Sequence, residues 1–253
     1  METILKKPSL YNLLYKDVTE DINLYKVLLK NYKEIVEYGA GTGRITIPIA
    51  QEGKKVIAID NESNMLDDLK FKVKEMGLEK NIIPIKADMI TYVCDKKEKC
   101  VIMPLTVFNY ILDDKEQEEC LKNIGKYLER DGTLIIELLT KKTFLDLTEN
   151  SESNLEYIKK IKTNDGYYEY WRTTTFDKNT NLIEQRRVFK HFNKENKNDS
   201  QEEFIWKNKF ITYNTIKQEL ERNDFVIETA YGNCKLDPYN EDSEDLFIKA
   251  KKV

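Results

Sequence analysis

Residues 34–44 read EIVEYGAGTGR, and this stretch decides the fold. Ile35 and Val36 open a short apolar run of the kind found in buried parallel strands. The run leads straight into three glycines at alternate positions, and the isoleucines that follow Arg44 predict a helix. A strand, a glycine turn and a helix in this order are typical of α/β proteins that grip a nucleotide-like cofactor.

The composition is that of an ordinary soluble protein with one sizeable core. The chain has 253 residues, of which 40% are hydrophobic and 34% charged, and its net charge is −4. This length allows one large domain and an appended subdomain. The acidic balance provides no electrostatic footprint for nucleic acid, so we do not expect a nucleic-acid partner. No run approaches the ~18 apolar residues that cross a bilayer, so we expect no membrane association.

The cysteines indicate neither a disulfide framework nor a metal site. Cys94, Cys100, Cys120 and Cys234 form no C-x-x-C pair, and the chain has a single histidine. A Cys/His zinc site is therefore disfavoured, and we predict no metal. Reduced thiols of this kind are typical of a cytoplasmic protein, which is the predicted location.

Strands and helices alternate regularly over the first 140 residues. Near-continuously apolar strands joined by helices predict a doubly wound parallel sheet. The predicted strands are 34–38, 56–60, 82–85, 100–103 and 133–138, and the predicted helices are 42–51, 62–76 and 114–129.

The rhythm changes between residues 141 and 211. Three strand-like runs, 167–176, 182–192 and 203–211, predict a three-stranded antiparallel β meander. A helix over 212–223 and strands over 225–229 and 245–251 then complete the sheet. We therefore predict an α/β domain made of 1–140 and 212–253, with 141–211 inserted as a substrate cover or dimer interface.

The glycine turn discriminates between cofactors. Arg44 stands where the dinucleotide fingerprint G-x-G-x-x-G needs its last glycine, which argues against NAD and FAD. No P-loop sequence is present. Asp60 closes the second strand, where a carboxylate can accept both ribose hydroxyls, and Asp88 follows the third strand, where one can accept from an adenine amine. The pattern suits a ribose and an adenine without a pyrophosphate.

The segments EYGAGTGR, VIAID and KADM together resemble the cofactor motifs of class I S-adenosylmethionine-dependent methyltransferases. The resemblance covers residues 10–140 well. It implies a seven-stranded Rossmann-like sheet whose last strand is antiparallel, with S-adenosyl-L-methionine as cofactor and S-adenosyl-L-homocysteine as product.

The resemblance also implies a role for individual residues. Glu37 would position the methionyl amine, Asp60 the ribose, and Met65, Asp88 and Met89 the adenine. Arg44 is also well placed to pair with the cofactor carboxylate. Taken singly, Asp60 also suits a helix N-cap and Met65 suits the core. The predicted cofactor-binding residues are Tyr15, Tyr25, Glu37, Gly39, Ala40, Gly41, Arg44, Asp60, Asn61, Met65, Asp88, Met89 and Leu105.

Two features concern the acceptor side. The tyrosine-rich stretch 11–25 resembles a helix that forms a lid in bacterial small-molecule methyltransferases, with Asn12 where an aspartate is common; we assign Tyr15 to this lid. The inserted meander resembles that of amino-sugar N,N-dimethyltransferases, and Tyr110 fills the position that orients the acceptor. Both tyrosines also suit simple packing. Asp113 and Asp114 start a helix, which favours capping over metal binding.

The predicted function is S-adenosylmethionine-dependent methyl transfer to a small-molecule acceptor, at nitrogen rather than oxygen. In-line positioning in a closed cleft supplies most of the rate. An amine acceptor needs only to be unprotonated, whereas a hydroxyl would need a base, and His191 is expected at the surface. The alternatives are an RNA or peptide methyltransferase and a non-catalytic cofactor-binding module. A homodimer is left open.

Overall fold

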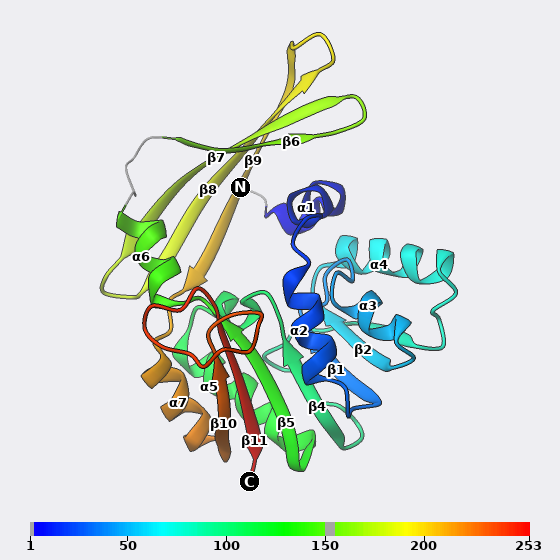
Figure 1. Ribbon diagram of the computed structural model, residues 1–253, viewed down its shortest axis with the longest axis vertical. Helices are drawn as coiled ribbons and strands as arrows, with labels where there is room; N and C mark the ends of the chain where they lie inside the picture. Colours follow the sequence, from blue (N-terminus) through cyan, green and yellow to red (C-terminus); the bar gives the residue numbers. More distant parts are fainter. Residues whose placement is uncertain (1–2, 150–154) are drawn as a thin grey trace.

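In the computed structural model, which describes residues 3–149 and 155–253, an α/β domain carries a second sheet above it (Figure 1). The main sheet has seven strands in the order β10-β11-β5-β4-β1-β2-β3. The strands are β1 (Glu34–Tyr38), β2 (Lys55–Asp60), β3 (Ile82–Lys86), β4 (Glu98–Met103), β5 (Leu128–Leu138), β10 (Phe225–Tyr231) and β11 (Leu246–Lys252). This order confirms the predicted doubly wound sheet.

The last strand runs against all the others. β11 pairs antiparallel with both β5 and β10, whereas β1, β2, β3, β4 and β5 are joined in parallel. Leu246 lies opposite Leu138 at one end of the β11–β5 ladder. The closing pair of strands is therefore slotted beside β5, as expected. The parallel strands end together at one edge of the sheet, where ligands bind in folds of this type.

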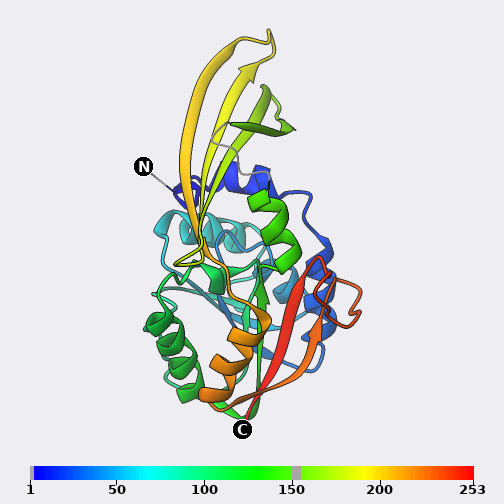
Figure 2. The ribbon, with the colours of Figure 1, turned by 90° about the vertical axis from the view of Figure 1, so that its left-hand side faces the viewer.

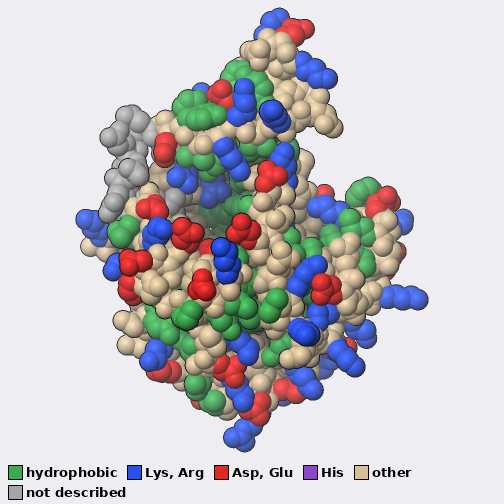
Figure 3. Space-filling model, in the orientation of Figure 1, with side chains coloured by type: hydrophobic (Ala, Val, Ile, Leu, Met, Phe, Trp, Pro, Cys, Tyr) green, Lys and Arg blue, Asp and Glu red, His purple; other side chains and the backbone are tan. Residues whose placement is uncertain are grey.

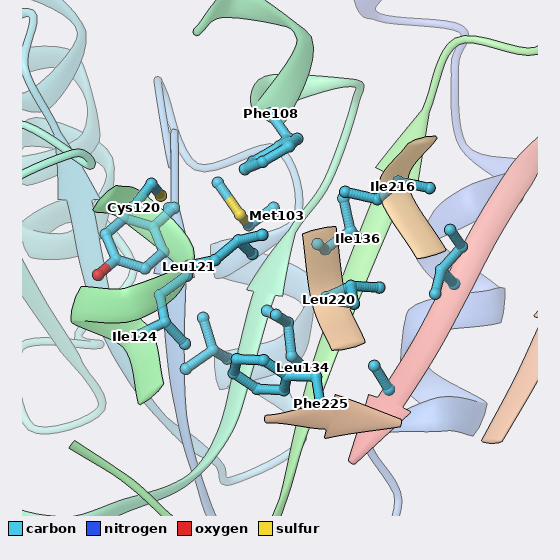
Figure 4. Packing of buried hydrophobic residues seen from close by; sticks show 14 of the residues in the cluster. Met103, Phe108, Cys120, Leu121, Ile124, Leu134, Ile136, Ile216, Leu220 and Phe225 are labelled. Carbon is cyan, nitrogen blue, oxygen red and sulfur yellow. The ribbon is translucent and has the colours of Figure 1, made fainter. Parts of the chain in front are cut away.

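Helices cover both faces of the main sheet because alternate strand residues point to opposite sides. Ile35 packs with α2, α3 and α4, whereas Val36 packs with α5 and α7. Figure 4 shows Leu121 of α5 and Leu220 of α7 in the second of these layers. The helices are α2 (Glu20–Leu28), α3 (Thr46–Gln51), α4 (Ser63–Glu75), α5 (Asp114–Tyr127) and α7 (Tyr213–Arg222).

The inserted sheet has four antiparallel strands, one more than predicted. They are β6 (Glu156–Lys162), β7 (Gly166–Asp177), β8 (Leu182–Asn193) and β9 (Asn198–Lys209), and α6 (Lys141–Glu149) precedes them. β6 was missed because four of its seven residues are charged and only Ile161 is buried, so it lacks an apolar pattern. The three long strands rise away from the α/β domain (Figure 2). The domain boundaries at 141 and 211 remain predictions, and residues 150–154 lie outside the described part.

The N-terminal segment lies against one face of the inserted sheet. It consists of the short helix η1 (Ile4–Lys6) and helix α1 (Pro8–Tyr15). Together with the sheet it forms a third apolar cluster, separate from the two layers of the main domain. The buried members of this cluster are Ile4, Leu10, Leu14, Ile161, Tyr170, Phe189, Phe204 and Trp206. This face, here called the inner face, is therefore held above the carboxyl ends of the main strands.

The structure corrects the expected location of His191 and confirms the expected capping role of Asp113. His191 is only 8% exposed and is not a surface residue: its Nδ1 lies 2.6 Å from Asp199 Oδ1 on the inner face of β8. Asp113 caps α5, because its side chain accepts from the N–H groups of Lys115 and Glu116. Over the described residues no helix is long and apolar enough to cross a membrane.

Candidate active site

A cavity of about 440 Å³ lies at the carboxyl ends of β1, β2 and β4. This cavity, called the first cavity, is walled by the glycine turn, by the starts of α4 and η2 (Val107–Tyr110), and by Tyr11 of α1. Eleven of the thirteen predicted cofactor-binding residues line it. They are Glu37, Gly39, Ala40, Gly41, Arg44, Asp60, Asn61, Met65, Asp88, Met89 and Leu105.

The glycines of the turn serve two different purposes. Gly41 has a φ of 54° and lines the cavity, where an added Cβ would meet only Met65 at 3.6 Å and the Gly39 carbonyl oxygen at 3.9 Å. Gly43 has a φ of 88° and does not line it; an added Cβ would fall 2.5 Å from Leu69 Cδ1. Gly41 therefore leaves room for a ligand to approach the backbone, whereas Gly43 lets α4 pack closely.

Asp60 joins the end of β2 to the glycine turn. One carboxylate oxygen accepts the Gly41 N–H at 2.8 Å and the other accepts the Glu62 N–H at 2.8 Å. Burial raises the pKa of Asp60, and the two backbone hydrogen bonds oppose this rise. Each oxygen has a second lone pair, so the fixed carboxylate can still accept two hydroxyl groups from the cavity.

Glu37 places a second carboxyl at the floor of the first cavity. It is 2% exposed, and Thr46 Oγ1 donates to its Oε2 at 2.7 Å. Burial raises the pKa of Glu37 to about 8, although Thr46 and Arg44 act in the opposite direction. A cationic group that entered the cavity would stabilise the ionised form. The site is thus suited to an ammonium group.

Arg44 lines the cavity but already has an anionic partner. Its two terminal nitrogens donate to the two Asp21 carboxylate oxygens at 2.8 and 2.6 Å, and one also donates to the Val18 carbonyl. The pair ties the start of α2 to the glycine turn. The predicted pairing of Arg44 with a cofactor carboxylate remains a prediction, and it would have to use the N–H groups that Asp21 and Val18 leave free.

The opposite wall of the cavity is built from two chain turns. Asn61 enters it from the β2–α4 connection, Met65 from the first turn of α4, and Asp88 and Met89 from the segment after β3. The Asp88 side chain also accepts the Ile90 N–H at 2.8 Å, which fixes the turn. Met65 and Met89 give this part of the cavity apolar surface, and Asp88 adds a carboxylate.

Tyr15 and Tyr25 do not line the first cavity. Tyr25 is fully buried, and its hydroxyl donates to Glu137 Oε2 at 3.3 Å. Tyr15 faces the inserted sheet, with its ring centroid 6.4 Å from that of Trp206. Tyr11, one helical turn before Tyr15, lines the first cavity instead. The tyrosine-rich stretch signalled a cover, but the sequence could not show which tyrosine lay over the cavity.

Asn12 anchors helix α1 to the glycine turn. Its Oδ1 accepts from Thr42 Oγ1 at 2.6 Å and from Lys72 Nζ at 3.2 Å, while its Nδ2 donates to Asp68 at 3.1 Å. The helix therefore covers the cavity in a fixed position.

The loop after β4 has an unusual backbone. Leu105 and Thr106 have φ values of 51° and 56°, a region that residues with a side chain seldom occupy. The Leu105 N–H donates to Glu137 Oε2 at 2.7 Å, which holds the bend. Strain of this kind is found at functional sites, and here the bend leads directly to Tyr110.

Tyr110 lies between the first cavity and the inserted sheet. It lines the cavity, and its ring centroid is 5.4 Å from that of Trp206. Burial raises the pKa of Tyr110 well above its usual value, so its hydroxyl stays protonated. It can therefore orient a polar group but cannot act as a phenolate base.

Comparison with known proteins finds similarity to methyltransferases. Residues 35–132 match the family model described as a methyltransferase domain. An uncharacterized methyltransferase of Bacillus licheniformis is 26% identical over 156 residues, which are 60% of this chain and 67% of that protein.

Solved structures show the same fold over nearly the whole chain. An S-adenosylmethionine-dependent methyltransferase from Clostridium acetobutylicum is 16% identical, with a TM-score of 0.78 and 95% of each chain covered. The sugar N-methyltransferase KedS8 from Streptoalloteichus is 10% identical, with a TM-score of 0.74, covering 96% of this chain and 92% of that one.

Residues 35–132 are thus similar to a methyltransferase domain, and the chain has the fold of solved S-adenosylmethionine-dependent methyltransferases.

Proposed function

We propose that the protein binds S-adenosylmethionine in the first cavity and transfers its methyl group to a nitrogen of a small molecule. The observation that carries this proposal is the fixed pair of carboxyl groups, Asp60 and Glu37, on either side of an open glycine turn. A ribose diol and an ammonium group are what two carboxylates at these places would bind.

The proposal assigns each part of the cofactor to a part of the cavity. Gly41 leaves the space that a homocysteine moiety would need beside the backbone. Met65 and Met89 would enclose the adenine, with Asp88 at its amine edge. The acidic lining also suits a donor whose sulfonium and ammonium groups are both positive.

The acceptor would enter at the Leu105–Tyr110 end of the first cavity. Bound S-adenosylmethionine supplies a methyl group activated by a positive sulfonium, which would depart as a neutral thioether when the methyl group is transferred. The chain itself would position the acceptor and exclude water. Tyr110 and Leu105 would hold the nitrogen in line with the bond between sulfur and the methyl group, and α1 and the inner face would keep water out.

We propose nitrogen rather than oxygen because a neutral amine needs no side chain to remove a proton before it attacks. A neutral amine has its own lone pair, whereas a hydroxyl acceptor would need a group that removes its proton. The Tyr110 hydroxyl stays protonated and cannot serve as that group. Similarity to a sugar N-methyltransferase supports the same choice. We also propose that the inserted sheet covers the substrate, because its inner face is turned toward the cavity.

Calorimetric titration with S-adenosylhomocysteine tests the cofactor, with NAD as the control. We expect micromolar binding of the first and none of the second. Incubation with S-adenosylmethionine and a panel of primary and secondary amines, followed by measurement of S-adenosylhomocysteine released, then tests the reaction. Tight binding without turnover on any amine would favour the non-catalytic module, and turnover on RNA or peptide alone would replace the small-molecule acceptor.

A further inference from the structure

A second, smaller cavity of about 120 Å³ adjoins the first one. It lies between the inner face of the inserted sheet and the loops that follow β4 and β5. Leu105 lines both cavities, and Tyr110 of the first contacts Trp206 of the second. A molecule whose reacting group lay near Tyr110 could therefore extend into this second cavity. Its lining is Tyr15, Leu105, Thr106, Leu139, Ile183, Gln185, Arg187, Trp206 and Asn208.

The second cavity has a cation and no carboxylate in its lining. The Arg187 guanidinium lies over the Trp206 ring, with its Cζ atom 3.4 Å from the ring centroid. Its Nε and Nη2 donate to Gln185 Oε1 at 3.0 and 2.6 Å. Stacking and hydrogen bonding fix the plane of the group, and Nη1 has no partner in the described ranges. A fixed guanidinium edge is the preferred partner of carboxylates and phosphates.

Arg187 differs from its neighbours in having no ion-pair partner. Arg186, on the outer face, pairs with Glu203, and Arg172 on the inner face lies 3.8 Å from Glu156. For Arg187 no carboxylate within the described part of the chain lies within ion-pair distance. A partly buried cation without a counter-ion is costly, so an anionic ligand here would be bound favourably.

A second arginine adds to this positive field. Arg172 lies directly opposite Arg187 in the β7–β8 ladder, and its buried Nε has no hydrogen-bond partner in the structure. Like charges directly opposite each other destabilise a sheet unless something compensates them. Figure 3 shows the surface hollowed below the inserted sheet, with Lys and Arg side chains above the hollow and several Asp and Glu side chains, with a Lys or Arg among them, at its lower rim.

We propose that the methyl acceptor carries an anionic group, a carboxylate or a phosphate, and that Arg187 binds it in the second cavity. This rests on the proposed function: the acidic first cavity would hold the cationic donor, and the basic second cavity would hold the acceptor's anion. Charge would then set the orientation of the acceptor, with its amine toward Tyr110.

Three ligands of similar shape test the proposal: benzoate, phenyl phosphate and benzamide. The readout is the fluorescence of Trp206 in a Trp171→Phe background, which leaves one tryptophan, with and without saturating S-adenosylhomocysteine. We expect at least one of the two anions to bind saturably and at least tenfold more tightly than benzamide. Whichever of benzoate and phenyl phosphate binds more tightly indicates whether the site prefers a carboxylate or a phosphate.

The matched variants are Arg187→Gln, Arg187→Lys and Arg186→Gln. We expect Arg187→Gln to abolish the preference for anions, Arg187→Lys to retain part of it, and Arg186→Gln, on the outer face, to leave it intact. Thermal melting verifies that each variant folds. Equal binding of benzamide, no binding of either anion to the parent protein, or an intact preference in Arg187→Gln would overturn the proposal.

The failure of the proposed function has a separate signature. If S-adenosylhomocysteine does not bind, calorimetry shows it directly, while the anion titration without cofactor still reports on Arg187. We expect Arg187→Gln to leave the affinity for S-adenosylhomocysteine unchanged, because Arg187 does not line the first cavity. A tenfold loss of that affinity would mean that Arg187 serves the cofactor instead.

Discussion

The Asp60 carboxylate accepts the Gly41 N–H at 2.8 Å, and this bond locks the end of β2 to the turn after β1. With a second bond from the Glu62 N–H, the carboxylate is held in one orientation before any ligand arrives. Because a preorganised group loses little freedom on binding, it contributes more to affinity than a mobile one.

Replacing Asp60 with alanine should therefore be costly. Two ribose hydroxyls would lose their acceptor, so we expect cofactor binding to weaken by more than the ~1–3 kcal/mol of one lost hydrogen bond. Calorimetry with S-adenosylhomocysteine measures the loss. Asp67→Ala, on an exposed side chain of α4, is the control and should bind like the parent. An unchanged affinity in Asp60→Ala would show that the ribose lies elsewhere.

The stability of the cofactor-free protein should fall as pH rises from 5 to 8. Burial raises the pKa of Glu37 to about 8 and that of Glu137 to about 7, above the ordinary value of 4.5. The folded state therefore binds more protons than the unfolded state in this interval. The stabilisation is complete below pH 4.5 and is lost as pH rises through the folded-state values, at about 1.4 kcal/mol per pH unit for each group.

Urea unfolding at several pH values checks this slope. We expect Glu37→Gln to flatten it, because the amide has no proton to lose. Glu52→Gln, at the exposed end of α3, should keep the slope of the parent protein. If Glu37→Gln and the parent showed parallel pH profiles, Glu37 would not be the buried acid that its position indicates.

Gly43→Ala should destabilise the fold more than Gly53→Ala. Both glycines have positive φ, at 88° and 81°, so either alanine would incur a backbone cost of about 1–2 kcal/mol. Only at Gly43 would the new Cβ clash, 2.5 Å from Leu69, and overpacking adds about 1–3 kcal/mol. The difference between the two midpoints of urea unfolding isolates the packing part. Equal losses would mean that α4 can shift away.

The sequence predicted the location of a residue correctly where that location depends only on the strand that carries or precedes the residue. Ile35 and Val36 point to opposite faces of the sheet, and both are apolar. Two consecutive apolar residues are expected where helices cover both faces of a strand, as they do here. Asp60 and Asp88 follow parallel strands, and such strands end at one edge, so both side chains were expected at one cavity.

The sequence did not predict contacts between elements that lie far apart along the chain. Tyr11 and Tyr15 lie one helical turn apart on the same face, and only the docking of α1 decides that the first covers the cavity. The second cavity was missed for a related reason. Arg187 and Trp206 lie on the face of a sheet with polar residues on both sides, and alternation alone does not tell which side meets the α/β domain.

Asn12 offers a last prediction, about the cover of the first cavity. Its Oδ1 accepts from Thr42 in the glycine turn and from Lys72, and its Nδ2 donates to Asp68. Asn12→Ala removes all three bonds, so we expect helix α1 to open more often and S-adenosylhomocysteine to dissociate at least threefold faster in stopped-flow measurements. Asn12→Asp keeps both accepted bonds but faces Asp68, whose charge Lys72 partly neutralises at 2.6 Å, so it should lie between Asn12→Ala and the parent. If Asn12→Ala released the ligand at the parent rate, apolar packing of α1 on the inserted sheet would be sufficient to hold the cover.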